Sequence, residues 1–205
     1  PGLNFVYADR AGNIGYQAAG MLPKRGQGRA VEGRVVSQSA GLIPLIAASG
    51  ADWQGYFPFD AMPSRYNPPE GFIVSANQQL PVELLPDPAL VISHEWAPKA
   101  RHDRISQLLQ TQIASGTPFS LEQMGHIQGD RIDLSALALL PKLQAVQATT
   151  PRETAALTEL AHWQGEFAAD SVGATLFATW AYNLKQELFG NLQNVGWQRP
   201  GKENL

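Results

Sequence analysis

The first residues of the chain alternate between strand-forming and turn-forming composition. Residues 4–8 are rich in aromatic and β-branched side chains, which favour strands. Residues 9–13 have the composition of a turn, and strand formers return in residues 14–18. This order predicts a β-hairpin over residues 4–20.

The next stretch holds one further predicted strand and a long connection. Residues 71–76 carry consecutive aromatic and β-branched side chains and predict a strand. Residues 21–50 are rich in Gly, Arg and Ser and contain Pro23 and Pro44, so we expect a long loop with little regular structure. Loops of this length in compact domains usually serve a function or move.

From about residue 96 onward, apolar side chains recur at helical spacing. Capping boxes that begin at Ser120 and at Thr150 each mark the start of a helix, because Gln or Glu follows the cap residue at the third helical position. An earlier helix is indicated by the apolar series Ile105, Leu108, Leu109 and Ile113.

Two more helices complete the pattern. One runs over residues 134–140 toward Pro141, and the last covers residues 171–189, with Ser171 as its N-cap and Gly190 as its stop. Strands in the first half followed by helices in the second predict an α+β fold rather than alternating βαβ units.

Composition narrows the class of protein. The 205 residues are 44% hydrophobic and 16% charged, which permits a packed core. The net charge of -3, with no cluster of Lys or Arg, argues against nucleic-acid binding. The chain has no Cys, so disulfides and thiolate metal sites are excluded. No apolar run approaches the roughly 20 residues of a membrane span.

Asn77 is the first candidate for chemistry, because it ends the strand predicted over residues 71–76. A reaction in which a carbonyl oxygen becomes an oxyanion needs hydrogen-bond donors for that oxygen. The Asn77 side chain could donate to that oxyanion, or it could simply start a turn before Gln78. The four histidines show no metal-ligand spacing with one another or with a carboxylate; they are His94, His102, His126 and His162.

Arg101 is the second candidate, and it opens the charged run Arg101 to Ile105. A guanidinium stays protonated, so it would act as a fixed donor and not as a base. The alternative is a solvated arginine at a helix start that pairs with Asp103 or another acid. Arg104, three residues later, is interpreted as structural.

An aromatic group beside Pro58 is the third candidate. It would form a wall of a substrate pocket, or it would pin a loop onto the sheet. The segment 67–71 is a Pro-rich turn that leads into the strand and helps to aim Asn77. The aromatic group consists of Trp53, Tyr56, Phe57 and Phe59.

In this order, residues 52–60, 67–77 and 101–105 resemble the large chain of the penicillin acylase family, whose members are N-terminal-nucleophile hydrolases. Residues 26–40 depart from the family by being longer and more polar. Shorter pieces extend the resemblance over nearly the whole chain, at residues 4–16, 20–25, 139–143, 163–165 and 170–177.

The resemblance implies a fold and roles for two residues. The whole enzyme would be a four-layer αββα sandwich, of which this chain holds part of one sheet and the helices packed on it. Residues 1–95 would be the sheet-forming part with long loops, and residues 96–205 the helical part. Asn77 would supply the oxyanion-hole side chain, and Arg101 would lie beside the active centre and help to orient the nucleophile region and the substrate.

The family's nucleophile is a Ser at the start of the large chain, whereas this chain begins with Pro1. We therefore expect the nucleophile to lie outside it and the isolated chain to be inactive. The partners would be the small chain and the rest of the large chain. Without them we expect the chain to self-associate, because sheet edges and apolar helix faces would lack their cover.

The implied reaction cleaves a linear amide into an acyl acid and an amine, such as a β-lactam side chain or an N-acyl homoserine lactone. The aromatic residues Trp53, Tyr56 and Phe57 would bind the substrate, and the parent protein would be periplasmic or secreted. Two alternatives stay open: a non-catalytic interaction module on an acylase scaffold, and a periplasmic small-molecule binder.

Calcium binding is common in the family, with one carboxylate ligand expected shortly before Trp96. Glu83 and Asp87 are the acids available there, but their spacing to Trp96 departs from the pattern, and nothing marks Glu95 as a ligand. We assign no metal and no other cofactor to this chain. Calcium remains possible in the complete enzyme.

Overall fold

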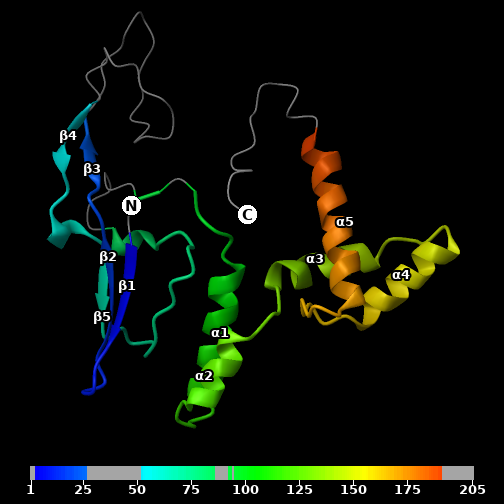
Figure 1. Ribbon diagram of the computed structural model, residues 1–205, viewed down its shortest axis with the longest axis horizontal. Coiled ribbons are helices and arrows are strands. Elements are labelled where there is room, and N and C mark those ends of the chain that lie inside the picture. The colour runs from blue at the N-terminus through cyan, green and yellow to red at the C-terminus, as the bar shows by residue number, and fades with distance from the viewer. Residues whose placement is uncertain (1–2, 27–51, 86–91, 94, 191–205) are drawn as a thin grey trace, which may run out of the picture. The chain divides into compact units, whose positions relative to one another are not determined.

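A computed structural model describes residues 3–26, 52–85, 92–93 and 95–190 (Figure 1). Contacts divide the chain into two units, Pro1–His102 and Asp103–Leu205, each described by itself below. Strands lie in the first unit and most of the helices in the second, which confirms the mixed α+β class. The strands are β1 (Leu3–Ala8), β2 (Ile14–Ala19), β3 (Pro23–Arg25), β4 (Trp53–Tyr56) and β5 (Ser64–Tyr66), and the α-helices are α1 (Ala100–Ala114), α2 (Leu121–Gln128), α3 (Leu134–Gln144), α4 (Pro151–His162) and α5 (Val172–Phe189).

The predicted hairpin is confirmed as β1 and β2, which pair antiparallel from Leu3 opposite Ala19 to Ala8 opposite Ile14. The turn is built on Asp9, whose carboxylate accepts hydrogen bonds from Asn13 and from the backbone N–H of Ala11. These bonds, led by the one from the Asn13 side chain, lower the pKa of Asp9 to about 2.

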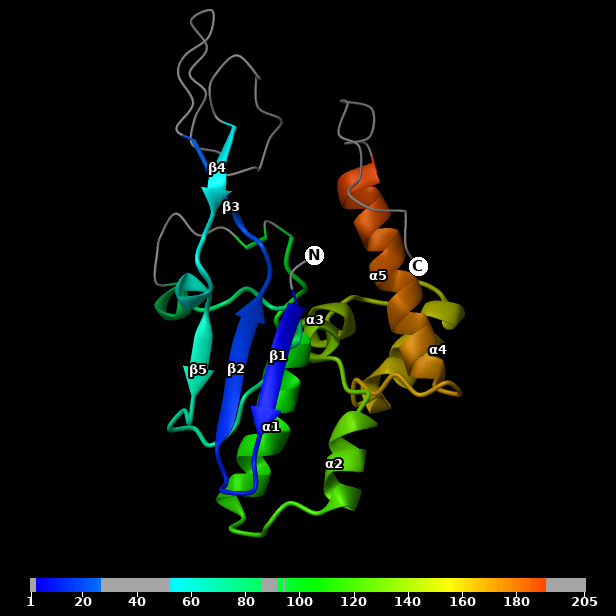
Figure 2. The ribbon, with the colours of Figure 1, turned by 60° about the vertical axis from the view of Figure 1, so that its left-hand side comes forward.

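The first unit contains two antiparallel sheets. In one sheet β2 lies between β1 and β5, as Figure 2 shows. In the other, β3 pairs with β4. The buried centre of this unit is formed by Tyr16, Ala18 and Met62, against which Phe57, Ile73 and Leu80 pack.

The strand predicted over residues 71–76 is wrong, because these residues form no sheet ladder. Their backbone groups bond to side chains instead. The N–H of Ala76 donates to Gln78 Oε1 at 2.8 Å, and the carbonyl of Val74 accepts from Gln78 Nε2 at 3.3 Å. A backbone whose polar groups are bonded in this way cannot pair with a neighbouring strand.

The expectation of a long irregular loop over residues 21–50 is corrected at its start, where Pro23–Arg25 form β3. The backbone of Phe57 donates to the carbonyl of Leu22 at 2.9 Å, next to this pairing. Residues 27–50 of the expected loop lie outside the described residues.

Both predicted capping boxes in the helical unit are confirmed. Ser120 accepts from the N–H of Gln123, whose side chain accepts from the Ser120 N–H. Thr150 and Glu153 make the same exchange at the start of α4. These bonds satisfy N–H groups that a helix start leaves without intrahelical partners.

The last helix was predicted correctly, whereas α3 is longer than expected. Ser171 caps α5, and Gly190 is its C-cap, although its φ of -59° is right-handed. Helix α3 continues past Pro141, because the buried Leu140 and Leu143 hold its last turn in the core. Burial of two leucines here outweighs the backbone hydrogen bond that proline cannot donate.

A second core joins α3, α4 and α5. It consists of Ala136, Leu140, Leu143, Leu160, Trp163, Ala174 and Phe177. The Trp163 ring lies so close to Gly173 that a Cβ at this position would stand 2.6 Å from Trp163 Cγ. None of the described helices is both long and apolar enough to cross a bilayer.

Candidate functional site

The backbone around Asn77 has an unusual conformation. Asn77 has a φ of 61°, in the left-handed region that few residues other than Gly and Asn adopt readily. Its neighbours Ala76 and Gln78 are buried, whereas Asn77 itself is exposed. The Asn77 carbonyl accepts from the backbone N–H of Ala97 at 2.8 Å, which ties this loop to the segment before α1.

Arg101, in the first turn of α1, reaches back to this loop. Its Nη2 donates to the Ala76 carbonyl and to Asn77 Oδ1, both at 2.8 Å. The structure therefore brings the two candidate residues into direct contact, although 24 positions separate them in the sequence.

This contact determines which way the Asn77 amide faces. A guanidinium has donors only, so the atom that meets it must be the amide oxygen. The amide nitrogen then lies on the other branch, and no described residue accepts a hydrogen bond from it. Asn77 thus presents an available N–H₂ donor whose direction is set by a fixed cation.

Arg104 has a separate set of contacts. Its guanidinium makes a bidentate pair with Asp130, with bonds of 2.9 Å and 2.7 Å. The hydrogen bonds from Arg104 lower the pKa of Asp130 below its usual value. The pair links α1 to the segment between α2 and α3, which is a structural role for Arg104.

The aromatic residues do not form one cluster. Trp53 and Tyr56, on β4, meet edge to face with ring centroids 6.1 Å apart, and both are exposed. Phe57 is half-buried and packs on the core around Met62. Phe59 lies in a short 3-10 helix with 67% of its surface exposed. Phe57 therefore anchors its segment, while the Trp53 and Tyr56 rings are exposed, with the Arg25 guanidinium over the Trp53 ring at 5.9 Å from its centroid.

Carboxylates and histidines do not gather into a metal site within the part of the chain that the structure describes. Glu83 is exposed in a second 3-10 helix, Val82–Leu84, and Asp87 lies outside the described residues. The donor set that calcium prefers, six to eight oxygens, is not assembled by the described residues.

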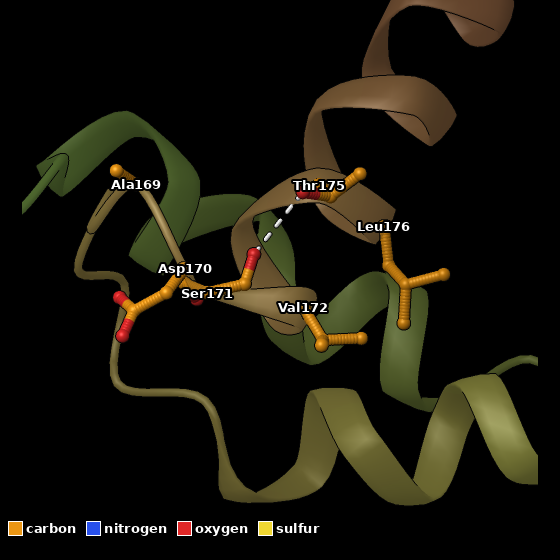
Figure 3. Close-up of a pocket in the computed structure, with 6 residues that line it drawn as sticks. All are labelled: Ala169, Asp170, Ser171, Val172, Thr175 and Leu176. Carbon is orange, nitrogen blue, oxygen red and sulfur yellow. Dashed lines mark hydrogen bonds between the residues drawn. The ribbon is translucent and has the colours of Figure 1, made fainter.

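A small pocket lies at the start of α5, in the helical unit (Figure 3). Sequence reasoning did not single it out as a pocket. The Ser171 hydroxyl accepts from the Ala174 N–H as the helix cap, and the Thr175 hydroxyl donates to the Ser171 carbonyl. These polar groups stabilise the helix start. The pocket is lined by Ala169, Asp170, Ser171, Val172, Thr175 and Leu176.

Sequence reasoning treated Gln78 as an ordinary turn residue and did not consider Ala97. Both hold the loop that carries Asn77. One sequence signal points to Gln78. It is a long amide side chain directly after the candidate residue Asn77 and two positions after the small apolar Ala76.

Comparison with known proteins shows the family of the chain. The family model described as penicillin amidase matches residues 1–202. The chain belongs to the penicillin amidase family. Penicillin G acylase of Escherichia coli is 30% identical over 169 residues, which cover 80% of this chain and 18% of that protein.

Other similar proteins carry related names. Penicillin acylase 2 proenzyme of Pseudomonas sp. strain SE83 is 28% identical over 177 residues, covering 85% of this chain and 20% of that protein. Acyl-homoserine lactone acylase QuiP of Pseudomonas fluorescens Pf-5 is 28% identical over 215 aligned residues, covering 96% of this chain and 24% of that protein. The chain thus spans about a fifth to a quarter of the length of these relatives.

One solved structure shows the same fold for most of the chain. It is a thermostable penicillin G acylase from Alcaligenes faecalis, with a TM-score of 0.52 and 27% identity. The match covers 80% of this chain and 27% of the acylase chain.

Proposed function

We propose that this chain is the oxyanion-hole segment of a larger acylase that cleaves linear amides into an acyl acid and an amine. The observation that carries the proposal is the 2.8 Å hydrogen bond from Arg101 Nη2 to Asn77 Oδ1, which leaves the Asn77 N–H₂ group as an oriented donor. Membership of the penicillin amidase family supports an amide as substrate.

Asn77 and Arg101 have different roles in the proposed hydrolysis. A nucleophile supplied by another segment attacks the amide carbonyl, and the carbonyl oxygen becomes an oxyanion. The Asn77 N–H₂ group donates to that oxygen and stabilises the tetrahedral intermediate. Arg101 contributes a permanent positive charge and fixes the amide that faces the reacting group. Collapse of the intermediate releases the amine, and water then frees the acyl group.

The names of the relatives and the exposed rings support a proposal for the substrate class. Similar proteins are named penicillin acylases and acyl-homoserine lactone acylases, so acyl amides of these two kinds are the proposed substrates. The acyl group would pack against the Trp53 and Tyr56 rings, with Phe57 holding their segment on the core. The parent protein would act in the periplasm or outside the cell, as a αββα sandwich completed by the remaining acylase segments.

The isolated chain is expected to show no amidase activity, because in this proposal it supplies the oxyanion donor but neither nucleophile nor base. The purified chain is assayed with phenylacetyl- and fatty-acyl-amide chromogens, beside the complete protein that contains it. Turnover by the isolated chain that survives purification and disappears with substitution of one internal Ser would refute this expectation. Absence of turnover by the complete protein would refute the proposed function itself.

The isolated chain is also expected to self-associate. Strand β1 is at the edge of its sheet among the described strands, and its apolar side chains are exposed, with Val6 64% and Leu3 60% accessible. Such an edge favours pairing with another copy. Light scattering across a dilution series should show the mass rising with concentration. A Val6→Lys variant should lower the association, and a wild-type chain that stays monomeric at high concentration would contradict the prediction.

A further inference from the structure

We infer that Gln78 is a positioning residue that sets the direction of the Asn77 amide; this inference rests on the proposed function of Asn77. Gln78 is the buried polar residue of the described chain, with 8% of its surface exposed. Its side chain folds back over the preceding residues. Oε1 accepts from the Ala76 N–H at 2.8 Å, and Nε2 donates to the Val74 carbonyl at 3.3 Å.

The chemistry of these two partners fixes the Gln78 amide in one orientation. A backbone N–H requires the amide oxygen, and a backbone carbonyl requires the amide nitrogen. Rotating the amide by half a turn would lose both bonds within a buried space, where an unbonded polar group is costly. The side chain is therefore a rigid brace across residues 74–76.

The brace acts on the same residue that Arg101 holds. Gln78 binds the N–H of Ala76, while Arg101 binds the carbonyl of Ala76 and the side chain of Asn77. Ala76 is thus fixed from both of its polar groups directly before Asn77, whose left-handed backbone needs support from its surroundings. Without the Gln78 side chain, the backbone of Ala76 is free to move. The Ala76 carbonyl is then no longer a fixed acceptor for Arg101 beside Asn77 Oδ1.

The test is a Gln78→Met variant of the complete acylase, which keeps the side-chain length but removes both hydrogen bonds. We expect kcat to fall about 10-fold or more while KM stays within about 2-fold, because a misdirected donor weakens transition-state contacts more than substrate binding. The matched control is Gln79→Met, which changes the exposed neighbouring glutamine in the same way and should leave kcat unchanged. If Gln78→Met does not fold, Gln78→Asn, which is too short to reach its partners, replaces it with the same expected result.

A double variant separates positioning from a general loss of stability. If Gln78 acts through Asn77, then Asn77→Ala with Gln78→Met should be no slower than Asn77→Ala alone. Multiplied effects would overturn the inference, and so would a Gln78→Met enzyme as fast as Gln79→Met. An Asn77→Ala enzyme with normal kcat would instead overturn the proposed function on which the inference rests.

Discussion

If the proposed function is right, replacing Asn77 by alanine in the complete protein should lower kcat about 100-fold or more, with little change in substrate affinity. The lost N–H₂ donor acts mainly on charge that develops in the transition state, and the substrate's neutral carbonyl has less need of it. Steady-state kinetics with a chromogenic acyl amide measures the split between kcat and KM. A kcat within a few-fold of wild type would make Asn77 a turn residue and nothing more.

Two variants control for damage to the loop. Asn77→Asp keeps an acceptor for Arg101 but removes the donor, so it should lose activity as Asn77→Ala does. Asn13→Ala is the control for the loss of an asparagine side chain, because the described bonds of the Asn13 side chain are to Asp9 and Asn67 and not to the residues around Asn77. That variant should lower the melting temperature and leave the kcat of the folded enzyme near that of wild type.

Replacing Arg101 by alanine should lower kcat by about 10- to 100-fold, because the Asn77 amide then loses the cation that fixes its orientation. The Ala76 carbonyl loses its bond at the same time. The variant should also discriminate less between good and poor substrates, because an Asn77 amide that rotates freely can donate to a substrate carbonyl in more positions. Kinetics with two acyl amides of different length measures both effects.

Arg104→Ala is the matched control for this experiment, since Arg104 lies three residues later on the same helix. It removes the bidentate pair with Asp130, so we expect a lower melting temperature. We expect no loss of kcat, because Arg104 makes no hydrogen bond to the described residues around Asn77 and its carboxylate partner, Asp130, lies in the helical unit. An equal loss of kcat in both variants would show that α1 as a whole, and not the Arg101 guanidinium, supports the reaction.

Features of the fold that depend on neighbours in sequence could be predicted. The hairpin follows from strand formers around the turn at Asp9, whose carboxylate binds groups within four residues. The capping boxes at Ser120 and Thr150 are exchanges between residues three positions apart. Local hydrogen bonds of this kind can be predicted from a few neighbouring residues in the sequence.

The loop around Asn77 could not be predicted in the same way. Its strand-like composition predicted a ladder, but its backbone bonds to Gln78, Ala97 and Arg101 instead. Two of these partners, Ala97 and Arg101, lie 20 or more residues away in the sequence. Strand propensity depends on local composition and does not include such distant partners. For the same reason α3 extends past Pro141: burial of Leu143 against distant helices decides where it ends.

The bond from Arg101 to Asn77 has an electronic consequence beyond geometry. An amide whose oxygen accepts from a cation shifts electron density from nitrogen toward oxygen, so its N–H groups become more acidic and stronger donors. In the proposed reaction, Arg101 would thereby strengthen the Asn77 donor by polarising its amide group. The Asn77 Nδ2 protons should resonate downfield in NMR spectra relative to those of exposed asparagines, and the shift should disappear in Arg101→Ala.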